Sequence, residues 1–144
     1  MPKQFHRPIE TPVGFVVGRD ALYLNWVQSD ITQNSLLLEL NINGHLASRC
    51  PSPTRDYLFF VEFFGVLAYR VIELDSAYHL DDQSEDEDDS ASSSFDEVVN
   101  SHWVAELGGK VTAENKHYQV NTYDDVLDVV CERFGMRVYD RLAE

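Results

Sequence analysis

The chain lacks basic residues over a long central stretch in which acids are abundant. Residues 71–109, here named the acidic block, contain no lysine or arginine but hold twelve of the 25 acidic residues. The rest of the chain has 13 acids and 11 bases, so the acidic block supplies nearly all of the formal net charge of −14. Charge confined to one segment indicates a binding surface more than a general solubility bias. Nucleic-acid binding is not expected, because phosphate contacts need clustered lysine and arginine.

Cysteine and long apolar runs are also scarce. Cys50 and Cys131 are the two cysteines, which are too few for a disulfide framework and belong to no Cys-x-x-Cys pair, so we expect reduced thiols. No run approaches the roughly eighteen apolar residues of a membrane span. Residues 1–8 lack the apolar segment of a signal peptide. The sequence predicts a soluble, cytoplasmic protein without a membrane partner.

Motifs that carry chemistry are missing as well. None of the five histidines has the spacing of a metal-ligand pair, and neither cysteine lies within ligand distance of one along the chain. The chain contains no Gly-x-Ser-x-Gly and no glycine-rich phosphate loop. Cys131 lies in an apolar stretch, where a buried structural thiol is expected. We therefore predict no cofactor, no metal and no catalytic residue.

Alternating apolar residues predict two β-hairpins. The first covers residues 12–27 with a turn at 18–20, and the second covers residues 35–50. In the second, Asn43-Gly44 is the dipeptide typical of a tight type I′ turn. One face of its first strand is expected to be buried, and it consists of Leu36, Leu38, Leu40 and Ile42.

Residues 57–74 fit both a strand and a helical stripe. Their many aromatic and β-branched residues favour strand, with Gly65 as a bulge, a bend or a break. Residues 117–121 and 136–139 are also predicted to be strands.

Two helices are expected in the second half of the chain. Ser94 and Glu97 fit a capping box at the start of a helix that Gly108 would end. Thr122, followed by acids, fits the start of a second helix that Gly135 would end. The sequence thus predicts one α+β domain over residues 1–144, a mostly antiparallel sheet built from hairpins with two short helices packed on it.

Residues 81–94 contain no large apolar side chain, so a mobile acidic loop is predicted at about 81–94. It is interpreted as a solvated insertion or as an electrostatic surface for a basic protein. A calcium loop is the weakest alternative, because the EF-hand glycine is absent. The candidate partner-binding residues are the acids in and beside the loop with the nearest tryptophan: Asp81, Asp82, Glu85, Asp86, Glu87, Asp88, Asp89, Asp96, Glu97 and Trp103.

Three segments together resemble a known group of proteins. They are the aromatic run at 56–71, the Asn-Ser-His-Trp-Val stretch at 100–104, and residues 117–130 with Thr122 and the pair Asp124-Asp125. This order resembles small acidic bacterial proteins, among them immunity proteins of contact-dependent and polymorphic toxins. The resemblance implies an α+β protein that occludes a toxin without turnover.

The leading hypothesis is a non-enzymatic protein that binds a basic protein partner stoichiometrically, as an immunity-type inhibitor of a toxin or enzyme. One alternative is a small metabolite-binding protein or enzyme whose pocket is lined by Trp26, Tyr69 or Trp103. Another is an accessory subunit. The chain is expected to be a monomer or a homodimer.

Overall fold

The computed structural model describes residues 3–49, 56–73, 93–109 and 111–140. Residues 81–92 of the predicted acidic loop lie outside these ranges, as does Cys50. The elements along the chain are β1 (Phe5–Pro8), β2 (Leu22–Asp30), β3 (Ser35–Asn43), the 3-10 helix η1 (Gly44–Leu46), β4 (Asp56–Phe64), β5 (Ala68–Glu73), β6 (Phe95–Val99), α2 (His102–Leu107), β7 (Lys116–Asn121), β8 (Asp125–Cys131) and β9 (Arg133–Asp140).

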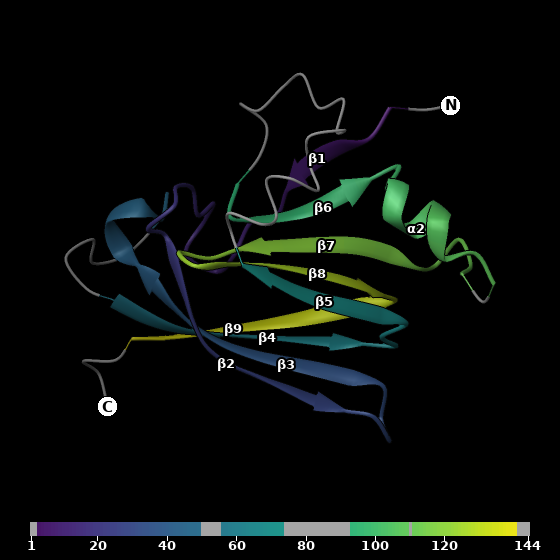
Figure 1. Cartoon of the computed structure of the whole chain (residues 1–144). Helices are drawn as coiled ribbons and strands as arrows, with labels where there is room; N and C mark the ends of the chain where they lie inside the picture. Colours follow the sequence, from purple (N-terminus) through teal and green to yellow (C-terminus); the bar gives the residue numbers. More distant parts are fainter. Residues whose placement is uncertain (1–2, 50–55, 74–92, 110, 141–144) are drawn as a thin grey trace.

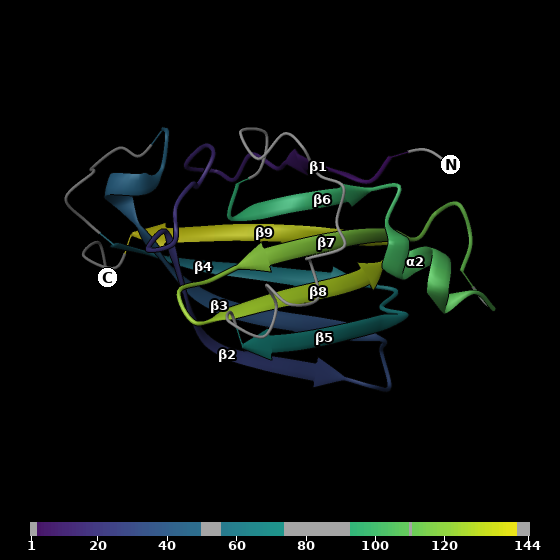
Figure 2. The same ribbon diagram turned by 45° about the horizontal axis from the view of Figure 1, so that its top comes forward.

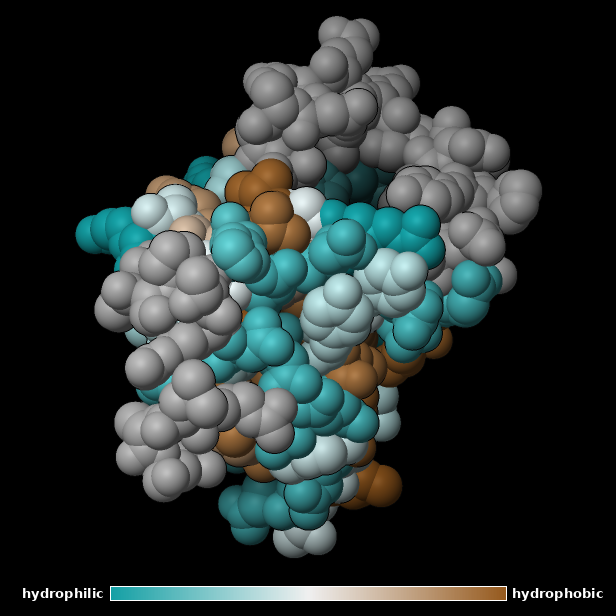
Figure 3. Space-filling model, turned by 90° about the vertical axis from the view of Figure 1, so that its left-hand side faces the viewer, coloured by the Kyte–Doolittle hydropathy of each residue, from teal (hydrophilic) through white to brown (hydrophobic). Residues whose placement is uncertain are grey.

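The strands form two antiparallel sheets that face each other. The five-stranded sheet has the order β1-β6-β7-β8-β5, and the four-stranded sheet has the order β2-β3-β4-β9. Figure 1 and Figure 2 show the two layers, with α2 at one end of the five-stranded sheet. The end of the sandwich seen in Figure 3 is mainly hydrophilic in its coloured residues, with hydrophobic residues scattered among them. The buried apolar side chains form one core cluster to which both sheets contribute.

The centre of the core is a cluster of aromatic rings from both sheets. Phe95 on β6 and Tyr118 on β7 meet Phe134 on β9 with ring centroids 5.3 and 4.8 Å apart. Phe63 on β4 lies 6.4 Å from Phe95, edge to face. Burial of each such side chain stabilises the fold by about 1.5–3 kcal/mol, so this cluster is a main contact between the layers.

One long antiparallel ribbon passes from one sheet into the other. Residues 56–73 pair with residues 125–140, first as β4 with β9 and then as β5 with β8. Phe64 with Arg133 is the last pair of the first half, and Ala68 with Val130 is the first pair of the second half. Between these two pairs one strand has three residues and its partner has two. An extra residue on one strand is a β-bulge, which bends and twists the ribbon.

Two backbone hydrogen bonds hold the bend together. The Leu67 N–H donates to the Val130 carbonyl at 2.8 Å, and the Glu132 N–H donates to the Phe64 carbonyl at 3.1 Å. Gly65 has φ +64°, a conformation that side chains with a Cβ rarely adopt. The strand predicted at 57–74, with Gly65 as a bulge, a bend or a break, is therefore confirmed over the described residues 57–73, as two strands joined by a bulged bend.

The predicted α+β class is wrong, because the described residues form a β-sandwich with one short α-helix and one 3-10 turn. The helix predicted after Thr122 is instead strand β8 followed by β9. Its expected cap atoms form the turn between β7 and β8, where Thr122 Oγ1 accepts a hydrogen bond from the Asp125 N–H at 3.0 Å. Strand β8 is buried on both faces, and such a strand reads as a continuous apolar run that resembles a helical stripe.

The helix predicted to begin after Ser94 is also wrong at its start. Phe95–Val99 is strand β6, and Ser94 Oγ donates to the Gly18 carbonyl at 3.0 Å. The helix in this region, α2, has six residues, and Ser101 is its N-cap and accepts from the Val104 N–H at 3.2 Å.

The hairpin predictions are confirmed in part. Strand β3 has the predicted buried face, but it pairs with β2 and β4 instead of with residues 45–49. Asn43 has φ −78° and precedes η1, so the predicted type I′ turn is absent. Within 12–17 the chain makes only the isolated bridges Thr11–Gly14 and Val16–Ala47 instead of a strand. Strand β7 confirms the strand predicted at 117–121, and β9 includes the one predicted at 136–139. No helix within the described ranges is long and apolar enough to cross a membrane.

Replacing Gly65 tests the bend of the ribbon. In Gly65→Ala the new Cβ would lie 2.7 Å from Glu132 Cδ, at a φ that alanine disfavours. We expect a loss of about 1–3 kcal/mol in the free energy of unfolding, measured by urea denaturation. The double variant Gly65→Ala/Glu132→Ala separates the two causes, because it removes the clash and keeps the backbone strain.

Gly135→Ala is the matched control. Gly135 is exposed on β9 and no atom lies within 4 Å of an added Cβ there. Its effect should lie within about 1 kcal/mol of zero. Equal losses at the two glycines would contradict a special conformation at the bend.

Candidate functional site

The three predicted partner-binding residues that the structure describes do not form one exposed surface. Of the ten, Asp81, Asp82 and the five acids at 85–89 lie outside the described residues. The other three are described and have different surroundings: Asp96 and Glu97 lie on β6, and Trp103 lies on α2.

Asp96 is fully buried, so it is not available to a partner in this structure. Its Oδ1 accepts hydrogen bonds from the Ser93 N–H at 2.8 Å and from Ser93 Oγ at 2.7 Å, and its Oδ2 lies 3.1 Å from His6 Nδ1. These contacts join the start of β6 to β1. Glu97 is half-buried and lies 3.7 Å from Arg7 of β1. Both acids tie the edge strand to the sheet.

Trp103 packs on the outside of the five-stranded sheet. The guanidinium carbon of Arg70 lies 4.3 Å from the centre of its ring, and the ring of His117 meets it edge-on with centroids 5.3 Å apart. A cation over an indole face is favourable. The side chain therefore fixes α2 against β5 and β7, and it covers a polar cluster beneath it.

That cluster centres on the carboxylate of Asp128, which is 2 % exposed. Its Oδ1 lies 2.6 Å from His117 Nε2 and accepts from Gln119 Nε2 at 3.1 Å, while its Oδ2 accepts from Arg70 Nε at 3.0 Å. The second ring nitrogen of His117, Nδ1, lies 2.7 Å from Ser101 Oγ. We name Arg70, Ser101, His117, Gln119 and Asp128 the Asp128 cluster.

Strand register explains how these residues meet. Asp128 is directly opposite Arg70 on β5 and Gln119 on β7, so the three form a transverse row on the outer face of the sheet. His117 is two residues from Gln119 and so faces the same way. The residues of the cluster come from β5, the N-cap of α2, β7 and β8, and no local motif in the sequence predicts that they meet.

The electrostatics of the cluster favour an ionised Asp128. Burial raises the pKa of this carboxyl. The pKa is lowered by the hydrogen bond with His117, by the charges of His117 and Arg70, and by the hydrogen bond from Gln119. These effects outweigh burial, so the pKa lies below its ordinary value of 3.8. A buried carboxylate with three polar partners has the hydrogen bonds that its burial requires.

A pocket of about 420 Å³ opens beside the cluster. Ser101 and His117 line it, together with the apolar side chains of Val98 and Val104 and with the polar residues Asn115 and Lys116. This size suits a small organic ligand.

The outer face of the four-stranded sheet is rich in aromatic residues. One row across its strands consists of Trp26, Glu39, Phe60 and Arg137, and the neighbouring row consists of Gln28, Leu37, Glu62 and Gly135. We name these eight residues, with Phe64 and Tyr139, the aromatic face. Trp26 and Tyr139 are 38 % and 43 % exposed, which is high for such large rings.

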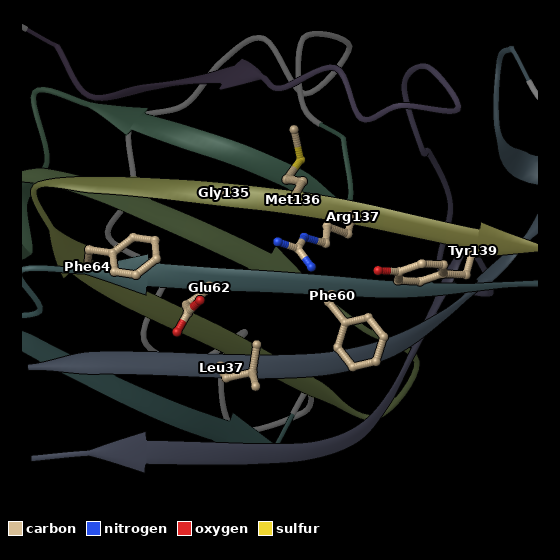
Figure 4. A pocket seen from close by; sticks show the side chains of 8 residues that line it. All are labelled: Leu37, Phe60, Glu62, Phe64, Gly135, Met136, Arg137 and Tyr139. Carbon is tan, nitrogen blue, oxygen red and sulfur yellow. The ribbon is translucent and has the colours of Figure 1, made fainter. Parts of the chain in front are cut away.

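A groove of about 470 Å³ lies on the aromatic face, where Gly135 has no side chain. Figure 4 shows Arg137 reaching over β4 between Glu62 and Phe60, and the ring of Tyr139 directed toward Phe60. The rings of Phe60 and Tyr139 meet edge-on at 5.9 Å. The groove therefore presents both apolar and charged groups to a ligand.

Trp26, Tyr69 and Trp103, which were predicted as alternative linings of a pocket, lie in three different places. Trp26 lies on the aromatic face, whereas Trp103 packs on the outside of the other sheet. Tyr69 lies on the edge strand β5.

Cys131 is fully buried, as predicted, and burial raises the pKa of its thiol to about 12. Such a thiol is unreactive at neutral pH. Among the residues that the structure describes, no three His, Cys, Asp or Glu side chains are arranged to hold a metal ion.

Comparison with protein-family models, with curated proteins and with solved structures gives no match to this chain. The resemblance to immunity proteins therefore stays a prediction, and the candidate sites stand on their geometry.

Asp128→Asn tests the charge of the cluster. Because the folded pKa lies below the unfolded value, the carboxylate stabilises the fold fully above about pH 5, and this contribution is lost as the pH falls through the folded pKa. We expect the variant to be less stable than the native chain by about 3–5 kcal/mol at pH 7. The difference should shrink below about pH 4, and urea denaturation between pH 3 and 7 measures it.

Asp125→Asn is the control, because the pKa of Asp125 is shifted in the opposite direction to that of Asp128. Burial, followed by the nearby charges of Asp124 and Glu73, raises the pKa of Asp125, so its ionised form is disfavoured by folding. This substitution should leave stability at pH 7 unchanged or slightly higher. A loss in Asp128→Asn that does not vary with pH would show that packing, and not charge, explains its effect.

Proposed function

We propose that the protein binds a basic protein partner stoichiometrically through the aromatic face, in the manner of an immunity-type inhibitor that occludes a toxin or an enzyme. Binding of this kind needs no turnover. The acidic block would steer the partner toward the protein, and the aromatic face would form the contact.

The observation that carries this proposal is the composition of the aromatic face. The outer surface of a sandwich sheet is usually polar, since it faces water. Here the ring centroid of Phe60 on β4 lies 6.4 Å from that of Trp26 on β2 and 5.9 Å from that of Tyr139 on β9. Trp26 and Tyr139 are well exposed. Tryptophan and tyrosine are the residues that most often anchor protein interfaces.

The charges of the face favour a basic partner. Glu62 lines the groove, and within the described ranges it has no ion-pair partner. A lysine or arginine of a partner could pair with Glu62 while its side chain packs on Phe60, which combines ion pairing with a cation–π contact. The net charge of −14 attracts such a partner from a distance.

Arg137 sets the direction of binding. It also lines the groove without an ion-pair partner in the described part of the chain, and it lies opposite Phe60 on the edge strand. An acid in the partner, placed next to the residue that reaches Glu62, would satisfy both charges. Glu62 and Arg137 thus select both the charges of the partner and the orientation in which it binds.

Truncating the aromatic face should weaken binding. The partner is first isolated from the source cells at low salt, and the complex is then rebuilt from the two purified proteins. We expect Trp26→Ala to cost about 2 kcal/mol of binding free energy, which is a roughly 30-fold rise in Kd, measured by calorimetry. Glu62→Gln should weaken binding to the basic partner in the same assay.

Tyr69→Ala is the matched control, because Tyr69 is as exposed as Tyr139 but lies on β5 of the other sheet. It should leave Kd unchanged. Equal effects of Trp26→Ala and Tyr69→Ala, or an acidic partner, would overturn the proposal. So would a homodimer that Trp26→Ala dissociates, since the face would then bind a second copy of the chain.

The steering role of the acidic block is tested by rate. Replacing the five acids at 85–89 with Asn and Gln should slow association at about 50 mM salt, and have less effect at 300 mM, where screening is stronger. Stopped-flow mixing measures both rates. The dissociation rate should change little, and an unchanged association rate at low salt would rule out steering by these acids.

A further inference from the structure

Ser101, His117 and Asp128 form a continuous hydrogen-bonded chain. Ser101 Oγ lies 2.7 Å from His117 Nδ1, and His117 Nε2 lies 2.6 Å from Asp128 Oδ1. The three residues are 9 %, 4 % and 2 % exposed, so solvent competes little for these hydrogen bonds. They are 16 and 11 residues apart in the sequence, which explains why motif searching predicted no nucleophile.

The partners of each atom show which groups donate. The lowered pKa of Asp128 keeps this carboxylate ionised, so Nε2 of His117 donates to its Oδ1. Ser101 Oγ accepts from the Val104 N–H. Its own hydrogen lies within reach of His117 Nδ1, and the ring tautomer that carries no hydrogen at Nδ1 accepts it.

This pattern of protons is that of an activated serine. A hydroxyl donates to a neutral imidazole, and a carboxylate orients the ring and stabilises the imidazolium that forms when it takes the proton. The ring is turned around relative to the familiar serine proteases, with Nδ1 toward the serine, but the roles are the same. We propose that Ser101 and His117, oriented by Asp128, form an acyl-transfer site for small carboxylic esters.

The adjoining pocket supports this assignment. Ser101 and His117 both line the space of about 420 Å³, with Val98 and Val104 as apolar neighbours for a short acyl chain. Lys116 lines it too, and within the described residues its ammonium has no ion-pair partner. A cation there would stabilise the negative oxygen that develops on the attacked carbonyl.

The reaction balances without any further reagent except water. Ser101 Oγ forms a bond to the carbonyl carbon while its proton passes to His117 Nδ1. The ester C–O bond then breaks, and the leaving alkoxide takes that proton and departs as an alcohol. Water then attacks the acyl-serine while its proton passes to the same nitrogen. The bond between Ser101 Oγ and the acyl carbon breaks, Ser101 Oγ takes the proton from His117 Nδ1, and the carboxylic acid leaves.

Helix capping alone does not explain the arrangement. Capping of α2 needs only an acceptor oxygen on Ser101, as the bond from the Val104 N–H shows. It does not need a histidine beneath the hydroxyl or a buried carboxylate beneath the histidine. The hydrogen-bonded chain from Ser101 to Asp128 lies beyond what the cap requires.

A fluorophosphonate probe tests the proposal on the native chain. The probe forms a P–O bond with an activated serine and releases fluoride, and peptide mass spectrometry identifies the labelled residue. We expect stoichiometric labelling at Ser101, and competition by a short-chain ester such as p-nitrophenyl butyrate together with its hydrolysis. Labelling that is absent, or that is found on other serines, in protein whose folded state is verified by circular dichroism would overturn the proposal.

Variants separate activation from folding. His117→Gln should slow labelling of Ser101 by at least about 100-fold, because the general base is removed. Ser94→Ala is the matched control. Ser94 is a buried serine directly before β6 whose hydroxyl donates to a backbone carbonyl, so this variant should keep the native rate. Thermal melts confirm that each variant is folded at the assay temperature. Equal labelling rates for the native chain and folded His117→Gln would show that His117 does not activate Ser101.

Discussion

The bend in the ribbon formed by residues 56–73 and 125–140 is the constraint on which the rest of the structure depends. One additional residue on the strand that contains Gly65 lets both strands turn together, so that each half of the ribbon joins a different sheet. The same face of the ribbon stays inside on both sides of the bend, and it carries Phe59 and Phe63 in one half and Leu127 and Val129 in the other. One bulge thus closes the sandwich around a single core.

The bend also determines what each outer face contains. The half in the five-stranded sheet turns Arg70 and Asp128 outward as a directly opposed pair, and β7 adds His117 and Gln119 beside them. Burying a carboxylate at this place would be costly if any of its hydrogen bonds were missing. Each neighbour of Asp128 supplies one, so the cluster is tolerated as a unit and its loss by single substitutions is not additive.

Local patterns in the sequence correctly predicted strands that have one buried face and one exposed face. They failed for a strand that is buried on both faces. Strand β3 alternates apolar and polar residues, and its buried face was predicted residue by residue. Strand β8 is buried on both faces, and with Thr122 at its approach it was mistaken for a capped helix. The meeting of Ser101, His117 and Asp128 depends on register between strands, which no single segment encodes. Of the twelve acids of the acidic block, the described sheets contain Glu73, Asp96 and Glu97, and the last two tie down an edge strand.

The two outer faces differ in whether their charges are already matched, and this difference separates their proposed roles. In the Asp128 cluster each carboxylate oxygen has a hydrogen-bond partner, so the charge of Asp128 is matched within the cluster and the ring of His117 is held in place. On the aromatic face Glu62 and Arg137 border a groove with neither of them in an ion pair within the described residues. Charges left unmatched beside exposed rings gain most from an external partner that supplies both complements at once. The Asp128 cluster, whose charges are paired within the protein, favours a reaction at a fixed geometry. The aromatic face, whose charges are not paired with each other, favours the binding of a partner protein.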